Sequence, residues 1–412
     1  MRVNTERLKE DIEALANFVD KSQIGWTRRA FTPFYEEARG WLKDKMKSLN
    51  LEVNIDAAAN VIGTLPGKEK HLPVIMIGSH IDTVKGGGRF DGIIGVVAGL
   101  EIVRLLKENG IQLRHPLQVV DFTAEEPSEF GISTIGSRGM VNNLPETMLF
   151  RKDLQGITLR EALKRSGGNP ERLTLEARKP GDVALYLELH IEQGPVLEQT
   201  NHQLGVVRGI AGIQRYRLTV EGEPNHAGTT PMNLRKDALT AAAEIILCFE
   251  QLCQETYQEE VVGTVGKLMN EPNAANVIPG KVTCELEIRS LDKDIQDMII
   301  SQLHHAALQI SKRRGVSVQF DCLSQSEPIL VQNNVRSVIE QACKEVAPTM
   351  FLSSGAGHDA NQIARIAPIG MIFVPSKNGR SHCPEEWTDY EDVALGVQAL
   401  LKALLLFDQQ LD

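Results

Sequence analysis

The chain has 412 residues, of which 42% are hydrophobic and 24% charged, the proportions of an ordinary globular protein with room for two domains. Its formal net charge is -10 and no Lys/Arg-rich run stands out, which argues against nucleic acid or an anionic membrane as a partner. No apolar run approaches the length of a membrane span, the first 19 residues lack the layout of a secretory signal, and the six cysteines are scattered, so we expect a cytoplasmic protein with free thiols.

Hydrophobic periodicity along the first 123 residues predicts alternating helices and strands. Thr32-Pro33 supplies an N-cap and a first-turn proline for the second helix. The helix after Asp91 is apolar on nearly all sides, so we expect it to lie buried as the crossover between two strands of an α/β sheet. The predicted helices are 6–19, 33–49 and 92–107, and the predicted strands are 51–55, 60–65, 72–77 and 116–123.

The strand at 72–77 leads into His80 and Asp82, and Asp91 follows a glycine-rich turn. Open α/β sheets place their chemistry at the carboxyl ends of the strands. The carboxylate of Asp82 can hold one imidazole nitrogen of His80 while the other nitrogen faces a metal ion. This pattern of a strand-end His-x-Asp followed by a second aspartate predicts a metal site.

Three more predicted strands, 116–123, 183–191 and 369–374, also end in polar clusters. Three imidazoles and at least two carboxylates suit borderline divalent metals such as zinc, manganese, cobalt or nickel. With this many ligands we expect two ions bridged by one carboxylate, which leaves one glutamate of an adjacent pair free to act as a base. The candidate residues are His80, Asp91, Glu125, Glu126, His190 and His382.

The middle of the chain changes character and reads β-α-β-β-α-β, the pattern of a ferredoxin-like module. We therefore predict a domain at 207–324 inserted into a catalytic domain formed by 1–206 and 325–412. A capping box at Thr158 and Glu161 predicts a further short helix. The remaining expected elements are strands 214–221, 261–269, 281–290 and 317–322, helices 236–252, 295–314, 335–346 and 391–407, and a glycine-rich loop at 353–360.

Seven motifs then occur in a fixed order: G-S-H-I-D-T, G-G-x-x-D-G, T-A-E-E, E-L-H-I-E-Q-G-P, N-H-A-G-T-T-P-M, N-x-I-P-G and G-x-S-H. Together they resemble those of the M20-type dinuclear metallohydrolases, in the branch of N-carbamoyl-L-amino acid hydrolases, β-ureidopropionases, allantoate amidohydrolases and ureidoglycolate amidohydrolases. The resemblance implies an α/β fold in which an open mixed-sheet catalytic domain of zinc-peptidase type carries the inserted module as a dimerisation and lid domain.

The resemblance also implies a role for each candidate residue. Glu125 would act as general base and then as proton donor to the leaving nitrogen, with Asp82 orienting His80. One of two divalent ions per subunit would be bound by His80, Asp91 and His190, and the other by Asp91, Glu126 and His382.

Residues that match the family's substrate-binding positions lie mostly in the inserted domain. By resemblance, His226 would complete the active site of the partner subunit in a homodimer and stabilise the oxyanion. Asn276 and Arg289 match positions that hold the substrate's carboxylate. Further candidates for contact with substrate are Arg215, Gln193, Gly357 and His358.

The expected activity is hydrolysis of an N-carbamoyl-L-amino acid to the amino acid, ammonia and carbon dioxide. An allantoate or ureidoglycolate-type amidohydrolase remains open, because Arg215 resembles the allantoate enzymes and the E-E-P-S-E-F-G stretch resembles the ureidoglycolate enzymes, with Glu129 replacing an arginine. The motifs are also compatible with an N-acyl amino acid deacylase, a dipeptidase, or a catalytically silent metal-binding or small-molecule-binding protein. The retained Glu125 argues against silence.

Overall fold

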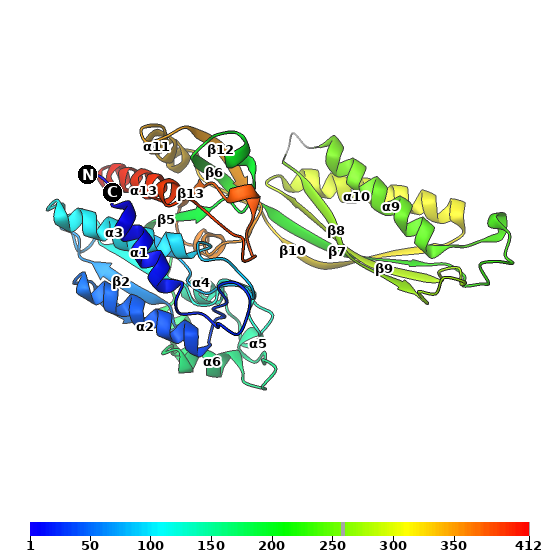
Figure 1. The fold of residues 1–412 in the computed structure, drawn as a ribbon, viewed down its shortest axis with the longest axis horizontal. Coiled ribbons are helices and arrows are strands. Elements are labelled where there is room, and N and C mark those ends of the chain that lie inside the picture. Colours follow the sequence, from blue (N-terminus) through cyan, green and yellow to red (C-terminus); the bar gives the residue numbers. More distant parts are fainter. Residues whose placement is uncertain (257–259, 412) are drawn as a thin grey trace. The chain divides into compact units, whose positions relative to one another are not determined.

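The computed structural model describes residues 1–256 and 260–411, so residues 257–259 and 412, which fall within the predicted domain ranges, lie outside the description. The described chain forms two compact units (Figure 1). Unit 1 comprises Met1–Arg208, Val331–Leu352 and Gly357–Asp412, and unit 2 comprises Gly209–Leu330 and Ser353–Ala356. The module predicted at 207–324 ends earlier than unit 2, because the last strand of its sheet runs to Ser326.

Unit 1 is built on a mixed sheet with the strand order β1-β2-β4-β3-β5-β13-β6, to which β12 adds by pairing with β6. The short strand β11, which pairs with Gly209 and Ile210 of β6, belongs to unit 2. β3, β4, β5 and β13 run parallel to their neighbours within this group, and β1, β2 and β6 are antiparallel. The predicted α/β class with a mixed sheet is confirmed. The strands are β1 (Glu52–Ile55), β2 (Val61–Leu65), β3 (Val74–Ser79), β4 (Leu117–Asp121), β5 (Val183–Ile191), β6 (Leu204–Ile210), β11 (Ile329–Leu330), β12 (Thr349–Ser354) and β13 (Ile369–Val374).

The longest helices of unit 1 arise where the sequence predicts them. The helix α3 joins the parallel strands β3 and β4 and is buried along most of its length. Thr32 caps α2, and Thr158 and Glu161 form the predicted capping box on α6. The helices are α1 (Thr5–Leu15), α2 (Pro33–Ser48), α3 (Ile93–Glu108), α4 (Ile135–Met140), α5 (Glu146–Leu149), α6 (Leu159–Arg165), α7 (Leu173–Glu176), α8 (Val196–Gln199), α11 (Asn333–Lys344), α12 (Ala360–Ile363) and α13 (Tyr390–Gln410).

Two elements differ from the prediction for reasons that lie far away in the sequence. The helix α1 stops at Leu15, because the buried guanidinium of Arg28 donates at 2.7 Å to the Leu15 carbonyl, which another helical turn would use. The same guanidinium also donates to the Phe18 carbonyl at 3.2 Å. The strand β12 includes Ser353 and Ser354, where only a loop was expected, because it finds β6 as a partner.

Unit 2 follows the β-α-β-β-α-β order and forms an antiparallel sheet with the order β10-β7-β9-β8. Its helices α9 (Ala238–Glu255) and α10 (Lys293–Arg314) lie along one face of that sheet (Figure 1). Alternate residues of β9 are buried under these helices, so charged side chains occupy the other face. The strands are β7 (Gly212–Glu221), β8 (Val262–Glu271), β9 (Lys281–Ser290) and β10 (Ser317–Ser326).

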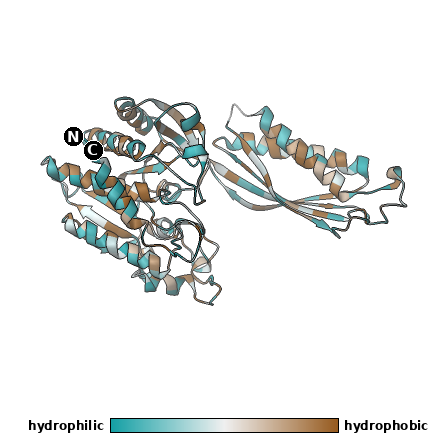
Figure 2. Cartoon of the chain, in the orientation of Figure 1, coloured by the Kyte–Doolittle hydropathy of each residue, from teal (hydrophilic) through white to brown (hydrophobic). Residues whose placement is uncertain are grey.

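The polar and apolar residues of the unit 2 helices are distributed as this layered architecture requires. Figure 2 shows that α9 and α10 alternate between polar and apolar residues along their length, the pattern of helices that cover one face of a sheet. Within the described residues, none of the helices is both long and apolar enough to cross a membrane.

Candidate metal centre

Two groups of possible metal ligands meet at the carboxyl ends of the parallel strands of unit 1. His80 follows β3, Glu126 follows β4, His190 lies near the end of β5, and His382 follows β13. In the part of the chain that the structure describes, the ligand atoms of His80, Asp91 and His190 lie within 4.8 Å of one another, as do those of Asp91, Glu126 and His382. Asp91 belongs to both groups.

The two carboxylate oxygens of Asp91 face different histidines. Asp91 Oδ1 lies 3.1 Å from His190 Nε2 and 3.9 Å from His80 Nε2. Asp91 Oδ2 lies 3.0 Å from His382 Nε2, which is 3.3 Å from Glu126 Oε1. This is the arrangement required of a carboxylate that bridges two cations.

Glycine is required after Asp91, at the start of α3. Gly92 has a φ of +71°, and a Cβ added there would lie 2.3 Å from His80 Nε2. A side chain at this position would therefore meet the imidazole as well as straining the backbone. The sequence Asp91-Gly92 thus brings the start of α3 directly against a candidate metal ligand.

Asp82 contacts the site in a different way from the one expected. Its carboxylate accepts hydrogen bonds from the backbone N–H groups of Glu125 and Glu126, at 3.1 and 3.2 Å. The imidazole of His80 hydrogen-bonds instead to the backbone carbonyl of Asp82, with 3.0 Å between Nδ1 and the oxygen, while the nearest carboxylate oxygen is 3.6 Å away. The main chain of Asp82 therefore makes the closer contact with His80, and its carboxylate binds the backbone N–H groups of the two adjacent glutamates.

Three segments of the site adopt the left-handed backbone conformation at residues other than glycine. Ala124, which precedes the two glutamates, has a φ of 52°, Gln193 has 60° and His382 has 56°. Such residues cost conformational energy and persist where the surrounding structure requires them, commonly at functional sites. These turns direct the side chains of Glu126, Gln193 and His382 toward Asp91.

Glu125 lies at the edge of the metal-ligand groups, with Oε2 at 3.7 Å from His80 Nε2. Burial raises the pKa of Glu125 well above its ordinary value, and the negative charges of Asp359 and Glu126 add to this effect. A carboxyl group whose pKa is raised in this way is suited to accept and return a proton near neutral pH.

The pKa shifts of Asp91 and its neighbouring histidines indicate whether these residues fit a divalent cation. Burial opposes ionisation of Asp91, but hydrogen bonds from His190 and His382 outweigh it, so its pKa lies well below the ordinary value. Burial likewise disfavours the charged form of His190, yet Asp91 raises its pKa to about 9. Hydrogen bonds to Asp91 and Glu126 raise the pKa of His382 to about 11. The buried carboxylates thus demand positive charge, and the imidazole and carboxylate donors match borderline divalent metals.

Two of the three predicted substrate contacts of unit 1, Gln193 and His358, touch candidate ligands. Gln193 donates from Nε2 to Asp91 Oδ2 at 2.9 Å. The ring of His358 is buried and packs edge-on against that of His190, with 4.6 Å between centroids, and burial lowers its pKa well below the ordinary value. A Cβ added at Gly357 would meet only Asn361 Oδ1, at 4.0 Å. In this structure Gln193 therefore contacts Asp91, and His358 contacts His190.

Two buried carboxylates near these ligands were missed from the sequence. Glu188 accepts hydrogen bonds from Ser79 Oγ and the Tyr186 hydroxyl, at 2.7 and 2.9 Å, and groups with His190 and His358. Asp359 accepts from Ser137 Oγ at 2.5 Å. A carboxylate inside an otherwise apolar strand was the available signal for Glu188.

Two predicted residues of unit 2, His226 and Asn276, occupy neighbouring loops at one end of its sheet. Ala227 N donates to the Asn276 carbonyl at 2.9 Å, and His226 forms a bridge with Val277. The side chain of His226 accepts from Gly228 N at 3.0 Å through Nδ1. Both His226 and Asn276 are exposed.

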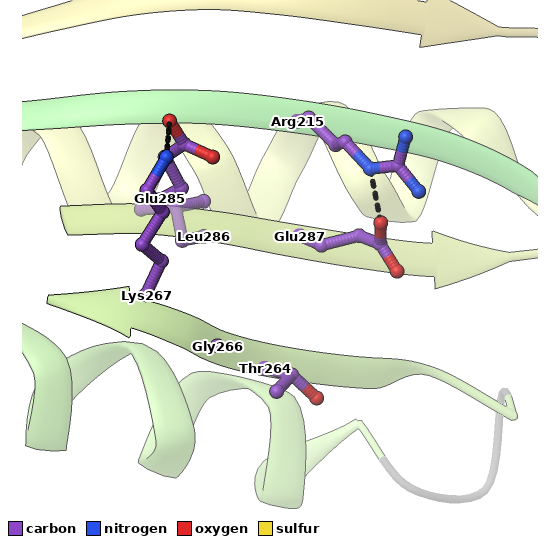
Figure 3. A pocket seen from close by; sticks show the side chains of 7 residues that line it. All are labelled: Arg215, Thr264, Gly266, Lys267, Glu285, Leu286 and Glu287. Atoms are coloured by element: carbon purple, nitrogen blue, oxygen red, sulfur yellow. Dashed lines mark hydrogen bonds and ion pairs between the residues drawn. The ribbon is translucent and has the colours of Figure 1, made fainter. Parts of the chain in front are cut away.

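The other two predicted residues of unit 2, Arg215 and Arg289, share a carboxylate on the charged face of the sheet. Arg289 donates from Nε to Glu287 Oε1 at 2.6 Å, and Arg215 pairs with the second oxygen of Glu287. A hollow of about 230 Å³ lies on this face beside Arg215, and Figure 3 shows the ion pairs Arg215–Glu287 and Lys267–Glu285 in its lining.

The register of the sheet separates these two sets of residues. Arg289 pairs with Ile213, and Lys281, at the loop end, pairs with Glu221. The strand from Lys281 to Arg289 spans roughly 27 Å at about 3.4 Å per residue. One copy of unit 2 therefore does not bring His226 and Asn276 together with Arg289.

The charge reversal at Glu129 is neutralised within unit 1. Glu129 Oε1 lies 3.0 Å from Arg29 Nη2, which also donates to the Pro127 carbonyl at 2.6 Å. The E-E-P-S-E-F-G stretch therefore presents an ion pair beside the catalytic candidates, and not an isolated negative charge.

Comparisons with known proteins agree with this geometry. Residues 76–406 match Peptidase family M20/M25/M40. An N-carbamoyl-L-amino acid amidohydrolase from Geobacillus stearothermophilus is 42% identical over 97% of both chains, and a ureidoglycolate hydrolase from Oryza sativa subsp. japonica is 38% identical over 98% of this chain and 84% of that one. The solved structure of a hydantoinase/carbamoylase family amidase from Burkholderia multivorans is 31% identical, covers 98% of both chains and superimposes with a TM-score of 0.93.

Proposed function

This chain belongs to the M20/M25/M40 peptidase family, and we propose that it is a metal-dependent amidohydrolase acting on N-carbamoyl-L-amino acids. The observation that carries the proposal is the pair of ligand groups that share Asp91, with the raised-pKa carboxyl of Glu125 beside them. The relative at 42% identity, named an N-carbamoyl-L-amino acid amidohydrolase, supports this choice of substrate.

In the proposed reaction, water attacks the carbonyl carbon of the ureido group and one of the two bonds from that carbon to nitrogen breaks. The carbamic acid that remains then breaks its own C–N bond and releases carbon dioxide. One N-carbamoyl-L-amino acid and one water yield the L-amino acid, ammonia and carbon dioxide. No oxidant or second substrate is needed, because the reaction is a hydrolysis.

Each subunit would hold two divalent ions, zinc, manganese, cobalt or nickel. His80, Asp91 and His190 would hold one, and Asp91, Glu126 and His382 the other, with the donor atoms described above. When bound, such ions supply Lewis-acid activation of water and of the scissile carbonyl.

Glu125 would accept a proton from the attacking water and return it to the leaving nitrogen. Its position is fixed by the hydrogen bond from its own N–H to Asp82 Oδ1 at 3.1 Å. Its low exposure, 8%, disfavours the charged form, so the carboxyl would regain the proton readily once the bond has broken.

The substrate's carboxylate would be bound by Arg289, which has an exposed face and donors in a planar fork suited to carboxylates. The expected role of Asn276 at the same carboxylate then requires a second chain, because roughly 27 Å of strand separate the two positions in one copy. This separation supports the proposed homodimer in which His226 and Asn276 complete the partner's site.

The edge of the unit 2 sheet offers a surface for that dimer. β8 is one of the two outer strands of this sheet, and it exposes Val262, Leu268 and Met269. An outer strand with exposed apolar side chains is a template for pairing with another chain. The cytoplasmic location expected from the sequence stays a prediction.

A ureidoglycolate-type or allantoate activity is the second candidate. It is favoured by the E-E-P-S-E-F-G stretch with its Arg29–Glu129 ion pair and by the 38% identity to a ureidoglycolate hydrolase. All these substrates are ureido acids that release ammonia, so a single assay separates them.

The test is ammonia release by the purified protein after removal of metals and reconstitution with Mn²⁺ or Zn²⁺. We expect turnover of N-carbamoyl-L-amino acids that exceeds turnover of allantoate and ureidoglycolate, and none in the metal-free protein. Selective turnover of allantoate or ureidoglycolate would replace the first candidate with the second. Absence of ammonia from every ureido acid would overturn both.

A further inference from the structure

Glu386, a buried carboxylate outside the proposed ligand set, holds the main chain of Asp91. Its side chain is 2% exposed. Oε1 accepts hydrogen bonds from the N–H groups of Phe90 and Asp91, at 3.0 and 3.1 Å. Asp91 and Glu386 are 295 residues apart in the chain, so a side chain that follows β13 fixes the backbone of a ligand that follows β3.

The second oxygen of Glu386 reaches the side chain of Asp91 through a hydroxyl group. Ser381 Oγ lies 2.9 Å from Glu386 Oε2 and 3.1 Å from Asp91 Oδ2. Asp91 Oδ2 is also the oxygen that lies 3.0 Å from His382 Nε2, and Ser381 directly precedes His382. Glu386 therefore ties the segment that carries Asp91 to the segment that carries His382.

The chain leaves space for this carboxylate. A Cβ added at Gly88 would lie 2.1 Å from Glu386 Oε1, so a side chain there would displace the carboxylate. Beside it, the ring of Phe90 packs edge-on against Trp387, with 5.3 Å between centroids. Gly88 therefore leaves room for the Glu386 carboxylate, and the residue after Glu386 packs against the residue before Asp91.

We propose that Glu386 is a positioning residue that sets the affinity of the metal centre through Asp91. A bridging carboxylate must present both oxygens in fixed directions, and groups that orient a ligand commonly change metal affinity by about 10- to 100-fold. The inference rests on the proposed metal centre, but it is tested by metal affinity and not by ammonia release.

Asp408 provides a matched control in the same unit. It is 6% exposed and accepts from the N–H groups of Arg114 and His115, both at 2.9 Å, across a similar sequence separation of 294 and 293 residues. None of the proposed ligands is among these partners. Loss of Asp408 removes the same kind of backbone contact without touching Asp91.

The experiment titrates metal-free protein with Zn²⁺ in competition with a chromogenic chelator, after circular dichroism has established that each variant is folded. Glu386→Ala is expected to lower the affinity for at least one of the two ions by about 10- to 100-fold, and Gly88→Ala to lower it in the same direction. Glu386→Gln is expected to stay within about threefold of the wild type, because its amide oxygen can accept both N–H groups and its NH₂ can donate to Ser381. Asp408→Ala should bind Zn²⁺ as the wild type does.

Wild-type affinity in Glu386→Ala, or an equal loss in Asp408→Ala, would overturn the inference. If the alanine variant does not fold, Glu386→Asp is measured in its place, because it keeps the carboxylate on a side chain that is shorter by one methylene. Ammonia release from a wild type that binds Zn²⁺ would leave the proposed function standing even if Glu386 had no effect. A wild type that binds no Zn²⁺ would overturn both.

Discussion

In unit 1 the candidate metal ligands converge and all but His382 are buried, whereas in unit 2 the candidate side chains lie apart and face solvent. His80, Asp91 and His190 are each exposed by less than 5%, and their ligand atoms lie within 4.8 Å of one another. Arg215 and Arg289 are 50% and 30% exposed and share a carboxylate on an open sheet face. Buried charges must be compensated by partners within the fold, whereas exposed charges are also stabilised by water.

The difference indicates what each unit can do alone. Unit 1 contains both candidate ligand groups that share Asp91, together with a candidate base. Unit 2 contains groups able to bind an anion, but the register of β7 and β9 keeps its two sets of candidates at opposite ends of the sheet. Metal binding should therefore depend on unit 1, while substrate affinity should depend on both units and on dimerisation.

The largest effect is expected for Glu125→Gln. Removal of the base should lower kcat by about 10²- to 10⁴-fold, while the variant still binds two ions because Glu125 belongs to neither ligand group. Steady-state ammonia release and metal content measured on the same preparation check this. A kcat within threefold of the wild type would exclude the proposed role of Glu125.

Mixing two inactive variants tests whether His226 serves the partner chain. His226→Ala alone should lose about 10²- to 10³-fold in kcat if it stabilises the oxyanion. When it is refolded in equal amounts with Glu125→Gln, half of the dimers are hybrids with one intact site each, so about a quarter of the wild-type activity should return. If His226 acted within its own chain, no activity would return.

A smaller effect is expected for Arg289→Gln. Loss of a charge-assisted contact to the substrate's carboxylate should raise KM about 10- to 100-fold. Arg217→Gln is the control, because Arg217 lies on the same sheet and pairs with Glu285 at 3.5 Å, and it should leave KM within about twofold. A carbamoylated amine without a carboxylate should be insensitive to Arg289→Gln, and sensitivity there would contradict the assignment.

The smallest effect concerns stability and separates a buried charge of unit 1 from an exposed one of unit 2. Burial raises the pKa of Asp121 to about 7, above the value of about 4 in an unfolded chain. Between these values the folded state binds more protons, so the free energy of unfolding of the wild type should fall with rising pH relative to Asp121→Asn. Denaturant titrations of metal-free protein at several pH values measure this difference.

Glu285→Gln is the matched control for that titration. A hydrogen bond from Lys267 lowers the pKa of Glu285. The difference in free energy of unfolding between Glu285→Gln and the wild type should therefore change only below about pH 4.5, the ordinary range of a glutamate. Arg39 Nε lies 3.4 Å from Asp121 Oδ2. If the difference in free energy of unfolding between the wild type and Asp121→Asn does not change between pH 4 and 7, Arg39 compensates the buried charge fully.

Much of the candidate metal centre could be predicted because residues that directly follow parallel strands meet at one edge of the sheet. His80, Glu126 and His382 each follow a predicted strand, and parallel strands bring their carboxyl ends to one edge. The glycine-rich turn Gly86-Gly87-Gly88, which returns the chain to Asp91, could be read in the same way, since glycine permits tight turns.

The rest could not be predicted, because it depends on contacts between distant segments. Nothing in the local sequence shows that Glu386 accepts the N–H of Asp91, or that the Asp82 carboxylate turns away from His80 toward two backbone N–H groups. The end of α1 depends on Arg28 in the same manner. Periodicity identifies which elements form and which face is buried, but not which polar partner each buried side chain finds.

The most direct test of this account is the number of divalent ions bound per chain, measured by elemental analysis after dialysis against Zn²⁺ or Mn²⁺. We predict two ions for the wild type, two for His226→Ala, and neither tightly held in Asp91→Ala, because Asp91 is common to both ligand groups. Two ions retained in Asp91→Ala, or a wild type that binds one or none, would contradict a centre bridged by Asp91.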